Sequence, residues 1–338
     1  MMGYEYIGIT VLWVFLYGYL IVASVDFGAG FFAYYARRTN KDHIMNKLIS
    51  RYLSPVWEVT NVFFVFFFVG LVGFFPDMAY YFGQALLIPG SIAIVLMAIR
   101  GSFYAFESYG SKNNSVFMFL YGATGLLIPA SLSTALTISE GGFLNVTDDG
   151  VRLQITELLL SPYSWSVVLL AIVSVLYISS MFLSYYAHKA GDKDALSLLR
   201  KYALFWSIPT IIASMTVFIA MSQHNPEHFD KLFDYWWVFG LSVLFYLIAV
   251  FLVYSEKLYG FAFIAVMLQF FFAFFGYGVS KLPYLLYPHV TISESVTPDA
   301  MGLALVVAFI GGLLLLIPSL VMLMRMFLFD ADYIKGNK

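Results

Sequence analysis

Four ionisable side chains lie within or against long apolar stretches of the sequence: Asp26, Glu58, Arg100 and Glu107. A charge inside a bilayer costs several kcal/mol, so it is rarely kept without a partner, a water route or a function. Three of the four are acids, which can take up and release protons, and all four gather toward one side of the chain's apolar segments. These residues predict a proton path that opens at one membrane face.

Asp26 is the deepest of these acids, and two glycines follow it closely, at positions 28 and 30. Because Gly28 and Gly30 lack side chains, a neighbouring helix or a ligand can approach the backbone there. Asp26 could lock helix packing by facing a polar group of a neighbouring helix. The rarity of carboxylates inside membranes favours the functional interpretation, in which Asp26 carries protons.

Glu58 follows Pro55 and Trp57 at the start of a second apolar stretch, with Asn61 one turn further on. Proline suits the first turn of a helix, and the helix dipole favours a negative charge there, which is a sufficient structural reason for Glu58. The functional alternative makes Glu58 a proton acceptor at the mouth of a path to Asp26, supported by Trp57 and Asn61. The residues alone do not separate the two interpretations.

Arg100 ends a third apolar stretch, and Glu107 lies seven residues later, two turns along the same helix face if the helix continues. Arg100 could extend its side chain to the interface. Alternatively it pairs with Asp26, Glu58 or Glu107 and keeps that carboxylate ionised. The second arrangement would give a chain of acids held by one fixed cation.

All five histidines lie between the apolar segments, which indicates that any haem is held by another chain. His224 and His228 are four residues apart, a spacing that binds metals on a helix. Pro226 interrupts that helix, so we interpret both as solvated loop residues and predict no metal site. The absence of cysteine excludes disulfides and thiolate sites, and we find no catalytic residue or nucleotide-binding motif.

Composition places the chain in a membrane: 61% of its residues are hydrophobic, 11% are charged, and the mean hydropathy is +0.84. A net charge of −2 gives no basic surface for nucleic acid. Apart from membrane lipid, the sequence by itself therefore names no partner.

The apolar segments predict an all-α, polytopic membrane bundle that forms a single domain over residues 1–338. About 20 apolar residues span a bilayer, and nine such segments are present. They cover residues 6–35, 56–76, 79–104, 115–138, 163–187, 202–222, 235–254, 257–277 and 300–327. Three Leu-Leu-Ile-Pro runs place Pro89, Pro129 and Pro318 inside apolar helices, where we expect kinks rather than a repeat.

The basic residues predict the orientation. Of the 18 lysines and arginines, 15 fall in alternate connections on one side, and only Arg152, Lys231 and Lys281 fall on the other. By the positive-inside rule the N-terminus lies outside and the C-terminus in the cytoplasm. Nine spans agree with that parity.

The chain resembles subunit II of the cytochrome bd quinol oxidases. The resemblance is carried by Asp26 with Gly28 and Gly30 in the first segment, by Pro-Val-Trp-Glu-Val-Thr-Asn over 55–61, and by Arg100-Gly101 at the end of the third. It covers essentially the whole length. Two acids found in many members are absent, since Ala23 and Ala105 occupy those positions.

The resemblance implies a haem-free subunit, packed against a similar subunit I that carries two b-type haems, one d-type haem and the quinol site. It further implies two four-helix bundles plus one additional helix, and a very small third subunit in many members. The complex would lie in the bacterial cytoplasmic membrane, oxidise quinol outside and reduce oxygen to water with cytoplasmic protons. Asp26 and Glu58 would help to line the proton path, with Glu107 as a further acid.

A proton-coupled secondary transporter is the alternative function. Membrane carboxylates, proline-containing helices and many spans fit it. The one-sided position of the acids and the lack of a clear inverted repeat argue against it.

Overall fold

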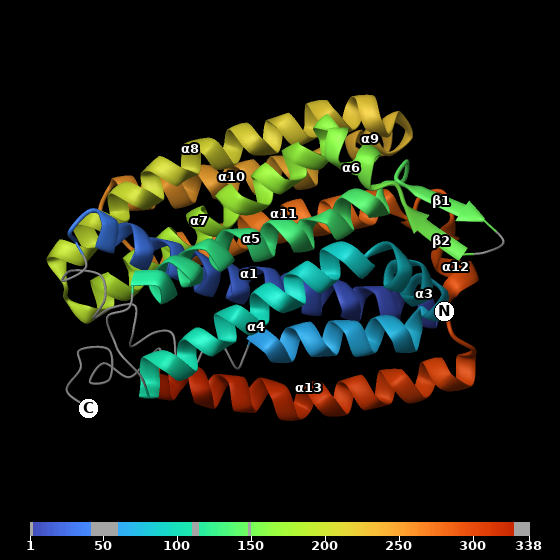
Figure 1. Cartoon of the computed structure of the whole chain (residues 1–338), viewed down its shortest axis with the longest axis horizontal. Coiled ribbons are helices and arrows are strands. Elements are labelled where there is room, and N and C mark those ends of the chain that lie inside the picture. Colours follow the sequence, from blue (N-terminus) through green and yellow to red (C-terminus); the bar gives the residue numbers. More distant parts are fainter. Residues whose placement is uncertain (1–2, 42–59, 110–114, 148–149, 328–338) are drawn as a thin grey trace.

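The computed structural model describes residues 3–41, 60–109, 115–147 and 150–327 and is predominantly helical (Figure 1). Eight long helices and one shorter helix, Thr60–Phe74, make up most of it. The long helices are α1 (Tyr4–Arg38), α4 (Leu87–Tyr109), α5 (Ser115–Ser139), α7 (Pro162–Ala190), α8 (Lys193–His224), α10 (Trp236–Tyr254), α11 (Tyr259–Lys281) and α13 (Asp299–Phe327). They run side by side along the longest axis of the molecule.

Local sequence signals explain where several helices begin and end. Ser161 caps α7 by accepting a hydrogen bond from Ser164 N, and Pro162 occupies the first turn. Gly191 ends α7 in the left-handed conformation (φ 74°). Asp192 then caps α8 through Ala195 N. Capping residues therefore specify the start of α7 and the Gly191-Asp192 turn that joins it to α8.

Short elements cover the end of the bundle where the chain begins (Figure 1). They are α3 (Pro76–Ala85), the hairpin of β1 (Leu144–Thr147) and β2 (Gly150–Leu153), α6 (Ile155–Leu160), α9 (Pro226–Asp234), the pair β3 (Tyr284–Leu286) and β4 (Val290–Thr291), and α12 (Ile292–Ser295). Both strand pairs are antiparallel. The all-α prediction holds for the apolar helices, while two predicted loops fold into these small sheets.

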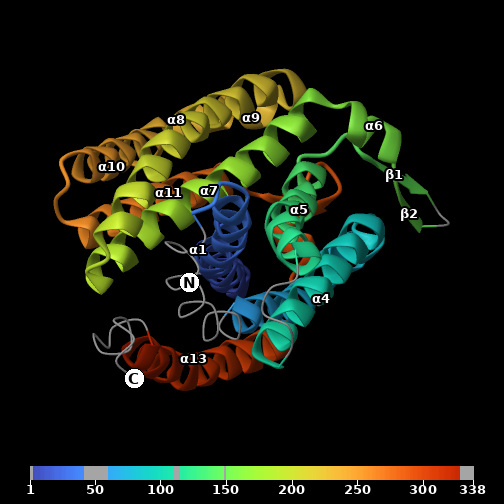
Figure 2. The same cartoon turned by 60° about the vertical axis from the view of Figure 1, so that its left-hand side comes forward.

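Helix α1 lies at the centre of the arrangement (Figure 2). It packs against α5, α7, α11 and α13, which come from all parts of the chain. Its 35 residues correspond to about 50 Å, longer than the ~30 Å hydrocarbon core of a bilayer. A residue near the middle of α1 is therefore enclosed by the rest of the bundle.

Seven described helices are long and apolar enough to cross a membrane, or eight if α3 and α4 together form one span. Helix Thr60–Phe74 is apolar but shorter, and the first part of its predicted segment, 56–59, lies outside the described residues. The chain is thus a polytopic helical membrane protein. Helices α10 and α13 keep most of their apolar surface exposed, and such a surface suits contact with lipid or with another subunit.

The prediction of one continuous segment over 79–104 is wrong in one respect, because the chain bends by 80° between α3 and α4. Pro89 gives the reason: it has no N–H to donate, and its ring clashes with the carbonyl four residues earlier, at Ala85. Helix α3 therefore ends at Ala85, and Pro89 falls in the first turn of α4. Pro129 and Pro318 lie inside helices that continue past them.

Candidate functional site

Asp26 and Arg100 form a buried ion pair inside the bundle. Arg100 Nε lies 3.0 Å from Asp26 Oδ2, and the two side chains are only 2% and 1% exposed. Arg100 also donates to the carbonyl oxygens of Asp26 (2.6 Å) and of Tyr121 (2.9 Å). Of the sequence alternatives for Arg100, the pairing with Asp26 is confirmed, and extension to the interface is not what the chain does.

Three helices contribute to this pair. Asp26 comes from α1, Arg100 from α4 and the Tyr121 carbonyl from α5. The guanidinium carbon lies 4.2 Å from the centre of the Tyr121 ring and 5.2 Å from that of Phe27, which adds cation–π attraction. The planar guanidinium has a fixed fork of donors that reaches a carboxylate and two carbonyls at once, whereas a lysine ammonium is a compact point charge without that fork.

The glycines beside Asp26 allow this close packing. A Cβ on Gly28 would lie 2.3 Å from Ser179 Cβ on α7, and a Cβ on Gly30 would lie 2.9 Å from an Arg100 guanidinium nitrogen. Gly125 on α5 is equally tight, since a Cβ there would lie 2.3 Å from the Phe27 carbonyl oxygen. The predicted close approach at Gly28 and Gly30 is confirmed: one faces a neighbouring helix and the other faces the arginine.

The remaining predicted residues are described only in part. Asn61 is half-buried in the helix Thr60–Phe74. Glu107 belongs to α4, which continues unbroken from Arg100 to Tyr109, but its side chain lies outside the described residues. Trp57 and Glu58 lie outside them altogether. Asp26 and Arg100 are thus the two predicted residues whose pairing the structure describes.

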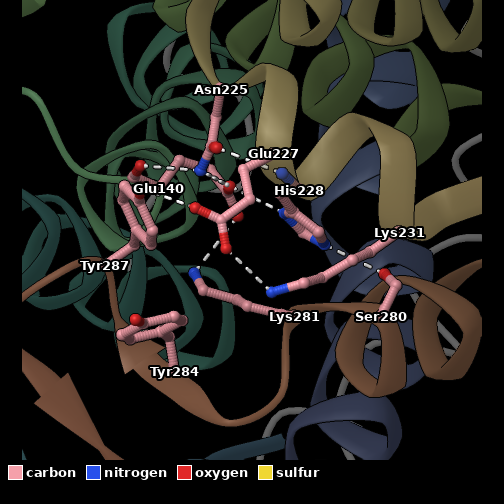
Figure 3. A pocket seen from close by; sticks show the side chains of 9 residues that line it. All are labelled: Glu140, Asn225, Glu227, His228, Lys231, Ser280, Lys281, Tyr284 and Tyr287. Carbon is pink, nitrogen blue, oxygen red and sulfur yellow. Dashed lines mark hydrogen bonds and ion pairs between the residues drawn. The ribbon is translucent and has the colours of Figure 1, made fainter.

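A second buried polar cluster, which the sequence analysis missed, lies where the short elements cover the bundle (Figure 3). Its centre is Glu140, directly after α5. One carboxylate oxygen accepts a hydrogen bond from Tyr277 and lies 3.2 Å from Lys281 Nζ. The other lies 2.8 Å from His228 Nδ1 and 3.2 Å from Asn225 Nδ2.

Four donors to one carboxylate keep Glu140 ionised. Burial by itself raises the pKa of this carboxyl, but the Lys281 ammonium and the hydrogen bonds from His228 and Tyr277 outweigh it and hold the pKa below its ordinary value of 4.5. The cluster joins the ends of α5, α9 and α11. Glu140 and Lys281 each stand within a few residues of a predicted span on the same side, but only the fold brings them together.

The histidines near this cluster are not the solvated loop residues that we predicted. His228 is 5% exposed, and its Nε2 lies 2.9 Å from Ser280 Oγ, so both ring nitrogens have partners. The His224 ring lies between the rings of Phe143 and Tyr163, with Nε2 3.1 Å from Gly141 O. Within the described ranges, no three His, Asp or Glu residues are placed to hold a metal ion.

The other two described histidines, His188 and His289, are exposed. The only buried histidine among the described residues is therefore His228, and its ring nitrogens are already engaged by Glu140 and Ser280. This donor set does not fit an axial ligand of a haem inside the bundle.

Comparison with known proteins identifies the family. The model of the family "Cytochrome bd terminal oxidase subunit II" matches residues 4–327. The chain belongs to this family. The bd oxidase structure from Geobacillus thermodenitrificans contains a chain 57% identical to it, with a TM-score of 0.84, covering 97% of this chain and 99% of that one. A curated relative from Bacillus subtilis (strain 168), "Putative cytochrome bd menaquinol oxidase subunit II", is 33% identical over 341 residues, 98% of each chain.

Membership of the cytochrome bd subunit II family settles the broad assignment. The chain is a membrane-spanning subunit of a respiratory quinol oxidase complex, and that complex is an oxidoreductase. A subunit II implies a partner subunit I. The proton-coupled transporter considered from the sequence is not favoured.

Proposed function

We propose that this chain is the haem-free subunit of its oxidase, that it supports the assembly of the haem-bearing subunit I, and that it carries cytoplasmic protons toward the site of oxygen reduction. The observation that carries the proposal is the Asp26–Arg100 pair. The pair is buried where α4 packs near α1, the central helix, and a buried charged pair is expensive to keep there. Packing alone could be achieved with apolar residues at both positions.

The path enters from the cytoplasm. Glu107 lies two turns beyond Arg100 on the unbroken helix α4, and Glu58 lies near the same membrane face by sequence. Arginine stays protonated at any working pH, so in the pair the proton acceptor is the Asp26 carboxylate. In this scheme Glu58 and Glu107 take up protons, Trp57 and Asn61 support the entrance, and Asp26 receives the protons inside the bundle.

The orientation follows from the charges. Arg37 and Arg38 lie in the last turn of α1, and Arg325 lies in the last turn of α13. Both helix ends lie away from the end of the bundle where the chain begins. With nine spans, the N-terminus is outside and the C-terminus is in the cytoplasm of a bacterial inner membrane. The helices form one membrane domain of two four-helix groups, with α13 as the additional helix.

The partner carries the redox chemistry. Subunit I would hold the b-type and d-type haems and the quinol site, and a very small third subunit would complete the complex. Oxygen reduction to water consumes four protons and four electrons per molecule, so the rate at which protons arrive can limit turnover. This chain would contribute no catalytic residue of its own.

The test is Asp26→Asn in the whole oxidase, which keeps the shape of the side chain but removes its charge. We expect quinol-driven oxygen consumption to fall about 100-fold, the low end of what a positioned proton-transfer group contributes, while the haem spectrum is retained. Asp26→Glu should restore part of the rate. Asp77→Asn, in the exposed first turn of α3, is the control. Full turnover of Asp26→Asn across the pH range would refute the proton role.

A further inference from the structure

The Arg100 guanidinium is anchored to the backbone of two helices as well as to a carboxylate. Its Nη1 donates to the Tyr121 carbonyl (2.9 Å), its Nη2 to the Asp26 carbonyl (2.6 Å) and its Nε to the Asp26 carboxylate (3.0 Å). Two of these three hydrogen bonds end on backbone carbonyls, which carry no charge and do not titrate. These two bonds therefore do not depend on whether Asp26 holds a proton.

The backbones of α1 and α5 close tightly around the guanidinium. A Cβ on Gly30 would lie 2.9 Å from Arg100 Nη1 and 3.0 Å from the Tyr121 carbonyl oxygen, and a Cβ on Gly125 would lie 3.5 Å from the same nitrogen. Gly122, the residue after Tyr121, is also close to α1, since a Cβ there would lie 2.7 Å from a side chain of that helix. Helix packing thus fixes the Tyr121 carbonyl in place.

The Tyr121 ring adds a third neutral contact. Its centre lies 4.2 Å from the guanidinium carbon, and Tyr121 is only 1% exposed. Cation–π attraction is stronger where water is excluded, and it does not require an ionised acid. A leucine at this position would keep the carbonyl but would offer no such attraction.

A carboxyl group that carries protons alternates between two charge states. The ionised Asp26 attracts Arg100, and this attraction is lost when the acid takes up a proton. A cation held by the carboxylate alone would then turn toward another acceptor, and the acid could ionise again only after the cation had returned. The two carbonyls and the ring hold Arg100 in place through both states.

We propose that Tyr121 is a positioning residue that keeps Arg100 beside Asp26 in both charge states of the acid, and that its ring thereby sets the pH range over which protons are delivered. The inference deepens the proposed function and rests on it. In each cycle one O–H bond of the Asp26 carboxyl group forms and later breaks. Arg100 keeps its protons throughout, and no electron moves.

Asp26 is the group in this site whose charge can change. The titratable or charged groups that the described helices place around it are Arg100 from α4, Tyr121 from α5 and Tyr19 from α1 itself, two turns earlier. Helix Thr60–Phe74 has no ionisable side chain, and α7 contributes Ser179 to this turn of α1. Tyrosine and arginine keep their protons at neutral pH, so a shift in pH dependence reports on the acid.

The first test is Tyr121→Leu in the whole oxidase, which removes the ring and keeps the carbonyl. A less firmly held cation stabilises the ionised acid less, so the pH profile of quinol-driven oxygen consumption should move by about 0.5–1 pH unit toward higher pH. On the acid limb of the profile this is a fall in rate of about 3- to 10-fold. Tyr121→Phe keeps the ring and should restore the profile of the unmodified oxidase.

Tyr177→Leu is the matched control. Tyr177 on α7 is fully buried like Tyr121, but its ring lies against those of Tyr246 and Phe270. The substitution removes the same atoms from the interior, so it should lower the melting temperature as Tyr121→Leu does and leave the pH profile in place. An equal movement of the profile in both variants would assign the effect to lost packing and would overturn the proposal.

The second test needs no turnover. Asp26→Asn imitates the protonated acid, and a cryo-EM structure of the oxidase with this substitution should show Arg100 still bonded to the Tyr121 carbonyl, with its guanidinium over the ring. An Arg100 side chain that has turned away overturns the proposal. This result decides the question even where Tyr121→Leu fails to assemble.

The outcomes separate this inference from the proposed function. If Asp26→Asn is slow and the profile of Tyr121→Leu stays in place, Tyr121 does not position the pair and the proposed function stands. If Asp26→Asn keeps full turnover across the pH range, the proton path fails and the role of Tyr121 fails with it.

Discussion

At the scale of single residues, Arg100 contributes most to the buried site. It is among the largest fully buried side chains, and its hydrogen bonds to Asp26 and to the Tyr121 carbonyl tie α4 to α1 and to α5. Its positive charge compensates the Asp26 carboxylate in a region where water cannot. Arg100 therefore contributes to stability in addition to any effect on proton transfer.

The prediction at this scale concerns stability. Arg100→Leu should lower the free energy of unfolding by about 3–5 kcal/mol, because it removes the ion-pair partner of a buried carboxylate. Arg100→Lys should cost about 1.5–3 kcal/mol, because lysine keeps the charge but loses the fork. Thermal unfolding of the purified complex measures both. Arg200→Leu, at the partly exposed pair with Glu256, is the control, and equal losses in Arg200→Leu and Arg100→Leu would contradict the argument.

At the scale of helices, α1 and α7 approach closely because of small residues. Ser179 on α7 donates a 2.9 Å hydrogen bond to the Val25 carbonyl, directly before Asp26, and Gly28 faces the same serine. This contact fixes the height of Asp26 relative to α7. The close helix approach thus positions the buried acid.

Gly28→Ala tests this contact. The added Cβ would meet Ser179 Cβ at 2.3 Å and the Val175 carbonyl oxygen at 2.8 Å, so backbone must move. We expect a loss of about 1–3 kcal/mol, read as a lower melting temperature and reduced yield of assembled oxidase. Gly240→Ala on α10, where nothing lies within 4 Å, should be neutral or stabilising by up to about 1 kcal/mol. If Gly28→Ala behaved like Gly240→Ala, the contact would not be tight in the protein.

At the scale of the whole molecule, the buried charges among the described residues occupy two separate places. Asp26 and Arg100 lie inside the bundle, whereas the Glu140 cluster lies where the short elements cover it. The second cluster joins the ends of helices from both halves of the chain. Glu140, Lys281 and His228 all have partners within it, so its main physical role is to hold these ends together.

Glu140→Gln tests this role. It should cost about 3–5 kcal/mol at neutral pH, because Lys281 loses its counter-ion and His228 loses its carboxylate partner. Since folding lowers the pKa of Glu140, its contribution is fully present above the unfolded value of 4.5 and is lost as the pH falls below it. The gap in melting temperature between the unmodified protein and Glu140→Gln should therefore be constant near neutral pH and narrow in acid.

The matched control is Glu227→Gln, at the exposed rim of the same pocket, where Glu227 pairs with Lys231. We expect no change in its melting temperature, because water screens exposed pairs. A Glu227→Gln variant as unstable as Glu140→Gln would show that the rim, not the buried centre, holds these helix ends.

The sequence alone determined the membrane class, most of the helical segments and the residues of the buried pair. These features are local: hydropathy over about 20 residues needs no partner, and a charge in such a stretch stands out wherever the helix packs. The close approach at Gly28 and Gly30 could be predicted for the same reason, because the lack of a side chain is a local property. The motifs around Asp26, Trp57 and Arg100 also carried the family, which the comparisons confirm.

Only the tertiary structure decided which groups meet. Arg100 had three candidate acids, and the packing of α1, α4 and α5 selected Asp26. Glu140, His228 and Lys281 are up to 141 residues apart and read as ordinary loop charges, yet folding buries them in one cluster. The burial of the Tyr19 hydroxyl is also invisible in sequence, since a tyrosine in a membrane helix usually reaches an interface. Burial and pairing depend on neighbours distant in the chain, and no local pattern encodes them.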